Sequence, residues 1–237
     1  MEIFTYFWHQ YLYVPGFNFL VWIYLNYSYY NLGITIIIST LLLRFVLLPF
    51  TILEEKGKIT TTELAGELDE IKKDYANDPV ELKIKFREAL HKRRVHPWAK
   101  AIVLGIQALA LLLLYQIFIT GINAQDNIQL LYPSIPRPDF INTMFLGFNL
   151  ANQSFSLPAL VAGYIFAEIL IVYWLEKRSM TKREQVFTIL FPAFVFLALA
   201  ALPAVKSIFV LTSLIFSTII AMVISLVKMV LKPNKRR

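Results

Sequence analysis

Apolar residues in this chain gather in long runs that are separated by polar or charged stretches. A helix rises about 1.5 Å per residue, so about 20 apolar residues cross a hydrocarbon layer roughly 30 Å thick. Five runs have suitable lengths, namely residues 32–53, 99–121, 157–175, 185–202 and 207–228. The pattern therefore predicts an all-α membrane protein with five transmembrane helices.

The first 31 residues are apolar but unusually rich in aromatic side chains. Tyr and Trp favour the boundary between membrane and water. Pro15-Gly16 interrupts the run, and neither half reaches the roughly 20 residues of a span. We expect Asn18 to Tyr27 to form a helix that lies along the interface and leads into the first span. An additional spanning helix is the alternative.

Residues 54–98 are highly charged, with ten acidic residues and ten lysines or arginines. Apolar residues recur there at helical spacing in two stripes, before and after Asp78-Pro79. Asp78 can cap a new helix and Pro79 fits its first turn. The segment is predicted to form a helical hairpin outside the membrane. At its end, Lys92, Arg93 and Arg94 form a basic cluster that could bind anionic headgroups.

The remaining segments connect or end the spans. Residues 122–156 contain several prolines and are predicted to lack regular structure, with Phe140 to Leu150 a candidate to dip into the interface. Residues 176–184 form a short charged loop, and residues 229–237 form a basic tail. Pro192 is expected to kink the fourth span, because proline removes a helical hydrogen bond.

Positive charge is distributed unevenly along this pattern. Twenty of the 23 lysines and arginines lie in the hairpin, at Lys100, in the short loop, at Lys228 or in the tail. Short cytoplasmic loops carry an excess of Lys and Arg. The N-terminus is therefore predicted to lie outside and the C-terminus in the cytoplasm. The net charge of +7 is interpreted as a signal of topology and of anionic lipid rather than of nucleic acid.

Composition argues against several classes of protein. The chain is 57% hydrophobic and 16% charged, against about 25% charged residues in a soluble domain. It has no cysteine, its three histidines lack metal-ligand spacing, and it has neither a glycine-rich phosphate loop nor a nucleophile–base set. We expect no enzyme activity, cofactor or metal. No cation precedes Arg44, so a cleaved signal peptide is not expected.

Arg44 is a charge inside the first span. Such charges are costly and are usually functional or paired within the protein. Glu168 in the third span lies at a similar predicted depth, since Arg44 precedes Leu53 by nine residues and Glu168 precedes Leu175 by seven. We hypothesise that Glu168 pairs with Arg44; alternatively, Glu168 is protonated and faces another helix.

Four motifs then point to a family. The first consists of Arg44, Leu48 and Pro49, and the second of Asp78 and Pro79. The third consists of Pro97, Ala99, Ile106 and Gln107. The fourth consists of Pro203, Ala204, Leu211, Thr212 and Ser213. With these motifs, the chain from about Asn18 to Val230 resembles the YidC family of membrane protein insertases. It departs from the family pattern at residues 108–113, at Phe209-Val210 and Ser213-Leu214, and in its long connector.

The resemblance implies a monomeric, multi-pass protein of the bacterial cytoplasmic membrane, with five spans and a polar groove open to the cytoplasm. Arg44 matches the groove arginine of the family. The candidate groove residues are Arg44, Thr40, Gln107, Glu168, Thr212 and Ser213. The polar ones among them could instead form interhelical hydrogen bonds, worth about 0.6 kcal/mol on average.

The implied partners are nascent membrane proteins and membrane lipids, with the ribosome and the Sec translocon as further candidates. The alternative function is a small-solute transporter or channel, which would also explain an intramembrane charge pair. That class predicts internal repeats, and five spans do not divide into two halves.

Overall fold

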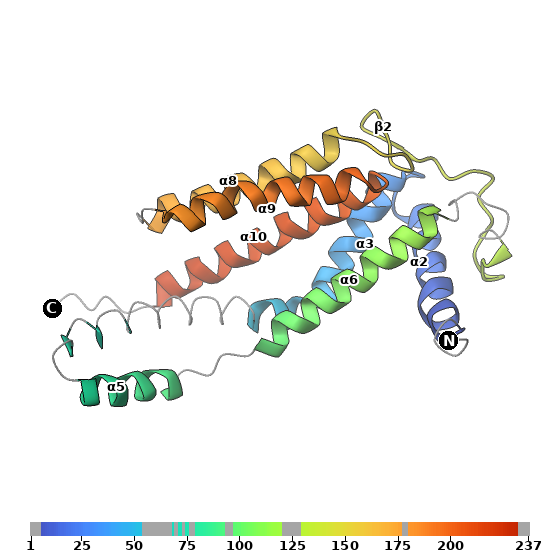
Figure 1. Ribbon diagram of the computed structural model, residues 1–237. Coiled ribbons are helices and arrows are strands. Elements are labelled where there is room, and N and C mark those ends of the chain that lie inside the picture. The colour runs from blue at the N-terminus through green and yellow to red at the C-terminus, as the bar shows by residue number, and fades with distance from the viewer. Residues whose placement is uncertain are drawn as a thin grey trace. The chain divides into compact units, whose positions relative to one another are not determined.

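The computed structural model describes residues 6–53, 68, 71–72, 74–75, 79–92, 97–119, 129–176 and 180–231 (Figure 1). Its elements in chain order are the π-helix η1 (His9–Tyr13), α2 (Val14–Asn26), α3 (Leu32–Val46), α5 (Pro79–Lys92), α6 (Pro97–Ile119), β1 (Met144–Phe145), β2 (Phe148–Asn149), α8 (Ser156–Glu176), α9 (Lys182–Ala200) and α10 (Val205–Leu231). The described part of the chain is thus predominantly helical, as predicted.

Three helices in the described part of the chain are long and apolar enough to cross a membrane. They are Ser156–Leu175, Lys182–Ala200 and Val205–Val227, which correspond to the predicted third, fourth and fifth spans. The first two predicted spans contain the shorter apolar helices Leu32–Val46 and Ala101–Ile117. The helical membrane-protein class is confirmed, and the count of five spans stays a prediction.

The chain divides into two compact units, each described by itself. The first comprises Met1–Arg44 and Ala108–Ile215, and the second comprises Phe45–Gln107 and Phe216–Arg237. The first unit holds η1, α2, most of α3, the C-terminal half of α6, the β-hairpin, α8, α9 and the start of α10. It contains most of the candidate groove residues.

The N-terminal helix continues through the dipeptide at which a break was predicted. Residues 6–26 are helical throughout, and the break expected at Pro15-Gly16 is wrong. A π-helical turn precedes Pro15, in which the Val14 N–H donates to the His9 carbonyl. The extra residue widens the helix where the proline ring would crowd the Tyr11 carbonyl, so the chain accommodates Pro15 without ending the helix.

The first predicted span is divided near its end. α3 stops at Val46, Leu47 forms a turn, and residues 48–53 are helical again. Pro49 explains the division, because it has no N–H to donate and its ring crowds the carbonyl of Phe45, four residues earlier. Arg44 consequently lies in the last turn of α3, where the helix dipole favours a cation.

The connector contains regular structure that the sequence did not predict. β1 and β2 pair in antiparallel register, with Met144 opposite Asn149 and Phe145 opposite Phe148. The prediction of an irregular segment is therefore wrong for residues 144–149. The flanking side chains of Ile141 and Leu150 are buried, and this long-range packing holds a hairpin that local propensity alone would not indicate.

Two clusters of buried side chains hold the first unit together. The larger one draws on α2, α3, α6, the connector and the start of α10, and includes Phe17, Ile36, Ile117, Leu150 and Val205. The smaller one joins α8, α9 and the first part of α10, and α8 and α9 lie side by side in Figure 1. Lipid tails are as apolar as leucine, so close packing and polar contacts rather than hydrophobic exclusion hold such helices together within a bilayer.

The predicted helical hairpin is described only in part. α5 begins at Pro79, as the sequence predicted, and carries an exposed ion pair of 3.0 Å between Lys85 Nζ and Glu88 Oε2. The hydrogen bond and charge of Glu88 raise the pKa of Lys85. Most of the predicted first helix, the Arg93-Arg94 pair and the tail 232–237 lie outside the described residues, so the helix pairing stays a prediction.

Candidate functional site

Arg44 belongs to the buried face of α3. Its side chain is only 5% exposed, and Thr40, one turn earlier, is 1% exposed. Leu32 and Ile36 continue the same row at intervals of four residues, and both are buried. Residues four apart share a helix face, so the charge of Arg44 is carried on the side of α3 that packs into the protein.

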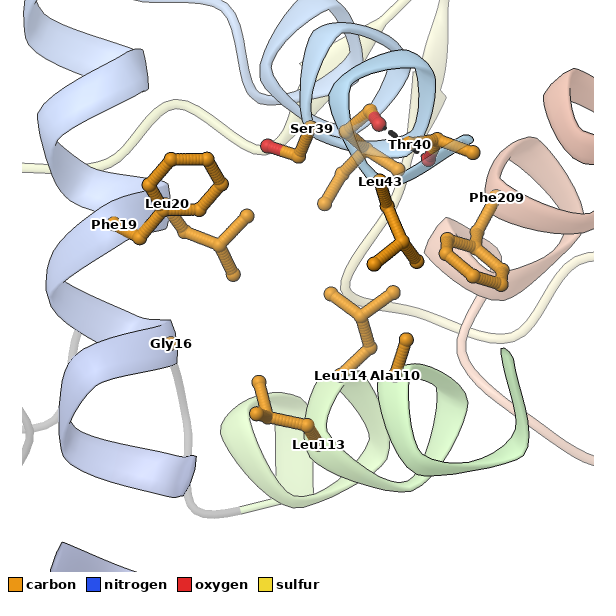
Figure 2. A pocket seen from close by; sticks show the side chains of 11 residues that line it. Gly16, Phe19, Leu20, Ser39, Thr40, Leu43, Ala110, Leu113, Leu114 and Phe209 are labelled. Atoms are coloured by element: carbon orange, nitrogen blue, oxygen red, sulfur yellow. Dashed lines mark hydrogen bonds between the residues drawn. The ribbon is translucent and has the colours of Figure 1, made fainter. Parts of the chain in front are cut away.

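A cavity of about 190 Å³ adjoins this face of α3 (Figure 2). Helices α2, α3, α6 and α10 each contribute side chains to it, and nearly all of these side chains are apolar. The lining residues are Gly16, Phe19, Leu20, Ile36, Ser39, Thr40, Leu43, Ala110, Leu113, Leu114 and Phe209.

The two hydroxyl groups at this cavity bond to their own helix. Ser39 Oγ donates to the Thr35 carbonyl at 2.7 Å, and Thr40 Oγ1 donates to the Ile36 carbonyl at 2.6 Å, the dashed line in Figure 2. Their protons are therefore already used. A group that enters the cavity would meet mainly apolar side chains there.

The buried face of α10 leads from the cavity to a polar group. Phe209 lines the cavity, and Ser213, one turn further along the same face, is 5% exposed. Its Oγ has no hydrogen-bond partner among the described residues, and the same holds for the buried Ser207 Oγ. A buried hydroxyl without a partner costs about 1–3 kcal/mol. Ser213 thus retains an unused hydrogen-bonding capacity within the described part of the chain.

The connector covers the end of the first unit at which α3 and α10 begin. Asn18, in the N-terminal half of α2, is buried and binds an earlier part of the connector, donating to the Leu130 carbonyl at 2.9 Å and accepting from the Tyr132 N–H at 2.7 Å. At α10, the Val205 N–H donates to the Leu150 carbonyl at 3.1 Å. Backbone hydrogen bonds thus attach the connector to the start of α10.

Depth below the connector can be counted along the helices. Arg44 follows Leu32, the first residue of α3, by twelve residues, which corresponds to roughly 18 Å. Ser213 follows Val205, the first residue of α10, by eight residues, or roughly 12 Å. Both polar groups lie well inside a hydrocarbon layer roughly 30 Å thick if the connector marks its surface.

Glu168 lines a different cavity. It is half-buried on α8, in a space of about 380 Å³ that α9 and α10 also line through Phe187, Phe191 and Leu214. Arg44 is not among the residues that line this cavity. The pairing of Glu168 with Arg44 stays a prediction.

Comparison with known proteins decides the family. Residues 22–231 match the family model described as 60Kd inner membrane protein, which covers most of the chain. The chain belongs to this family, the YidC family of membrane proteins. The resemblance inferred from the sequence motifs is thereby confirmed.

Three relatives of this YidC-family chain are bacterial proteins. The membrane protein insertase YidC of Fusobacterium nucleatum is 28% identical over 176 residues, which are 66% of this chain and 85% of the relative. The Clostridium tetani insertase YidC is 29% identical over 132 residues, 55% of this chain and 57% of the relative. The insertase YidC 1 of Streptococcus pyogenes serotype M6 is 26% identical over 167 residues, 68% of this chain and 53% of the relative. They support a multi-pass bacterial inner membrane protein.

For the other predicted site residues of this YidC-family chain, the structure gives the helix on which each lies and, for some, its burial. Thr212 is half-buried on α10 beside Ser213. Gln107 is half-buried on α6 and belongs to the second compact unit. Lys92 is the last residue of α5, whereas Arg93 and Arg94 lie outside the described residues. The described structure therefore associates Arg44 and Thr40 on α3, and Thr212 and Ser213 on α10.

Sequence reasoning missed two buried polar residues of this chain. Lys206, assigned from the sequence to a turn, is 2% exposed, and its Nζ lies 3.7 Å from the centroid of the Tyr115 ring. Asn18 was placed in an interfacial helix, yet it is a buried hydrogen-bonding hub. Each is a lone polar residue in an apolar stretch, and that isolation is the signal that could have identified them.

Proposed function

We propose that this chain inserts small membrane proteins through a groove that runs from the apolar cavity beside α3 to Arg44. The observation that carries the proposal is the burial of Arg44 on the same face of α3 as the cavity residue Thr40. Family membership supports the general function of a membrane protein insertase. The arginine groove is the finer proposal made for this chain.

The physical problem is the passage of polar groups through hydrocarbon. Each unsatisfied polar group costs several kcal/mol there. A hydrated groove that reaches partway across the membrane shortens that path, and Arg44 attracts acidic residues of the incoming segment. The apolar helix of the substrate then moves into lipid, which supplies the free energy at roughly 25 cal/mol per Å² of apolar surface buried. No nucleotide is required.

The groove is proposed to open toward the cytoplasm. The excess of Lys and Arg in the hairpin, the short loop and the tail favours this orientation, with the N-terminus outside. The connector would then lie on the outer side, where its hydrogen bonds to the starts of α3 and α10 would help to close the groove. A groove closed at one end retains the permeability barrier while a substrate enters from the other end.

Other side chains are proposed to support Arg44. Ser213, Thr212 and Gln107 would offer hydrogen bonds to polar groups of the substrate. Glu168 would pair with Arg44 or moderate its charge, because a nearby carboxylate offsets part of the cost of a buried guanidinium.

Recruitment is proposed to use the cytoplasmic hairpin. The basic cluster Lys92, Arg93 and Arg94 would bind anionic headgroups, at about 1 kcal/mol per charge near the surface. Nascent membrane proteins are the proposed substrates, delivered by the ribosome with or without the Sec translocon. The chain is proposed to act as a monomer.

The proposal is tested by substituting Arg44 and following insertion of a small single-span protein into liposomes. Arg44→Ala is expected to lose insertion, whereas Arg44→Lys is expected to retain it, because the groove requires a cation rather than a particular hydrogen-bond geometry. Full insertion by both variants would contradict the arginine groove. Failure of the unmodified chain to insert any substrate would favour the transporter alternative.

A further inference from the structure

The tip of the β-hairpin has an unusual residue in an unusual conformation. Leu146 and Gly147 connect the strands with φ angles of 48° and 83°. Glycine adopts this left-handed region freely, whereas a leucine is disfavoured there, and such turns normally carry Asn or Asp before glycine. Leu146 is also 79% exposed. If this loop lay in water, a polar residue at position 146 would be more favourable than leucine, both for the left-handed conformation and for the exposure of the side chain.

Further exposed apolar side chains accompany Leu146. Phe140 is 65% exposed and Met144 is 48% exposed, and Phe155 is also largely exposed on the same connector. No charged residue occurs between Asp139 and Glu168. Several large apolar side chains are thus exposed within one uncharged stretch, as at sites where a protein meets an apolar partner.

The hairpin is held in place by α3 and its neighbours. The Leu32 N–H at the start of α3 donates to the Asn142 carbonyl at 3.4 Å, and the Asn142 N–H donates to the Tyr24 hydroxyl at 2.9 Å. The Phe145 ring packs so closely over Gly33 that a side chain at that position would overlap it. The tip therefore has a defined position at the end of the helices.

That position is where membrane spans begin. α8 starts at Ser156, directly after the exposed Phe155, and its own Leu160 is exposed as well. α10 starts at Val205, whose N–H is bonded to Leu150 of the connector. The uncharged part of the connector thus leads directly into a helix that is long and apolar enough to cross a membrane, and lipid is the occupant that this continuity of the chain favours.

We propose that the hairpin tip inserts into the bilayer surface at the end of the bundle where α8 and α10 begin. Leu146, Met144 and Phe140 would lie at the boundary between headgroups and acyl chains of glycerophospholipids. The polar segment that precedes them, with Arg137 and Asp139, would face water. The hairpin would then fix the height and tilt of the bundle at that surface.

Spin labelling tests the proposal directly, because the chain contains no cysteine. Single cysteines would replace Leu146, the exposed Ser134 of the same connector, and Leu160 of α8. Each full-length variant carries a nitroxide and is reconstituted in phosphatidylethanolamine–phosphatidylglycerol liposomes. Collisions with oxygen, which concentrates in lipid, are then compared with collisions with a water-soluble nickel chelate.

The label at 146 is expected to resemble the label at 160, with a several-fold higher ratio of oxygen to nickel accessibility than the label at 134. A ratio equal to that at 134 would overturn the proposal by placing the tip in water. Low accessibility to both reagents would also overturn it, because a protein would then cover the tip.

A second variant tests whether the apolar side chain of Leu146 itself holds the tip in the lipid. Leu146→Asn suits the left-handed turn and should preserve the hairpin. With the label at position 140, this substitution is expected to lower the oxygen-to-nickel ratio, because the tip loses an apolar anchor. An unchanged ratio at 140 would show that the tip does not depend on lipid contact, and would overturn the proposal.

Discussion

The Nζ atom of Lys206 lies 3.7 Å from the centroid of the Tyr115 ring, and the lysine is almost completely buried. The pair joins the first turn of α10 to α6 within the first compact unit. A desolvated cation over an aromatic face is stabilised by about 2 kcal/mol. The contact therefore links two helices at the end of the bundle that the connector covers.

Removal of Tyr115 and removal of Lys206 should lower the stability of the protein by different amounts. Tyr115→Leu leaves a buried cation without its ring and should destabilise the protein more than Lys206→Met, which removes the charge and retains an apolar side chain. Unfolding in detergent provides the measurement, with Tyr115→Phe as the control that keeps the ring. The double variant Tyr115→Leu/Lys206→Met should lose less free energy of unfolding than the sum of the losses in the two single variants. Strict additivity would contradict a direct interaction.

Gly33 should tolerate no side chain. A Cβ atom there would lie 2.7 Å from Phe145 Cβ and would overlap the ring. Gly33→Ala is therefore expected to lower the free energy of unfolding by about 1–3 kcal/mol, as overpacking does elsewhere. Gly163→Ala in α8 is the matched control, because no atom lies within 4 Å of a Cβ added there. Equal stability of both variants would contradict the close packing of Phe145, and Phe145→Leu should partly rescue Gly33→Ala.

Ser213→Ala separates a functional hydroxyl from a structural one. The Ser213 Oγ is buried without a partner among the described residues, so its removal should leave stability unchanged or raise it by about 1 kcal/mol. Insertion of a small single-span protein should nevertheless slow if Ser213 serves the substrate. Ser207→Ala is the control, since its Oγ is also buried and unpartnered but lies nearer the start of α10. Equal insertion activity of the two variants would contradict a role for Ser213 in the groove.

Glu168→Gln tests whether this carboxylate moderates Arg44. If the two charges interact, the variant makes the groove more cationic, so insertion of substrates with acidic tails should increase relative to those with neutral tails. The same substitution in an Arg44→Lys background should give a similar bias, that is, a similar increase in insertion of acidic-tailed over neutral-tailed substrates. In an Arg44→Ala background this bias should vanish. A persistent bias without a cation at position 44 would show that Glu168 acts on substrates independently.

The amino-acid sequence by itself determined the class of this protein, its family and most of its helices. The apolar runs predicted α8, α9 and α10 closely, because length and composition are enough to specify a span. The motifs around Arg44 and Pro203 identified the family, which the match over residues 22–231 confirmed. The start of α5 at Pro79 followed from local capping chemistry alone.

Only the tertiary structure decided which side of each apolar helix faces the protein. A membrane helix is apolar all round, so periodicity does not identify its buried face, and the burial of Thr40 and Arg44 required the packing of α3. The partners of Asn18 and Lys206 are distant in sequence, as is the ring that covers Gly33. The π-turn before Pro15 and the β-hairpin of the connector likewise depend on contacts that no local pattern encodes. Local chemistry thus sets where helices begin and end, whereas long-range packing decides which polar groups are buried and what they meet.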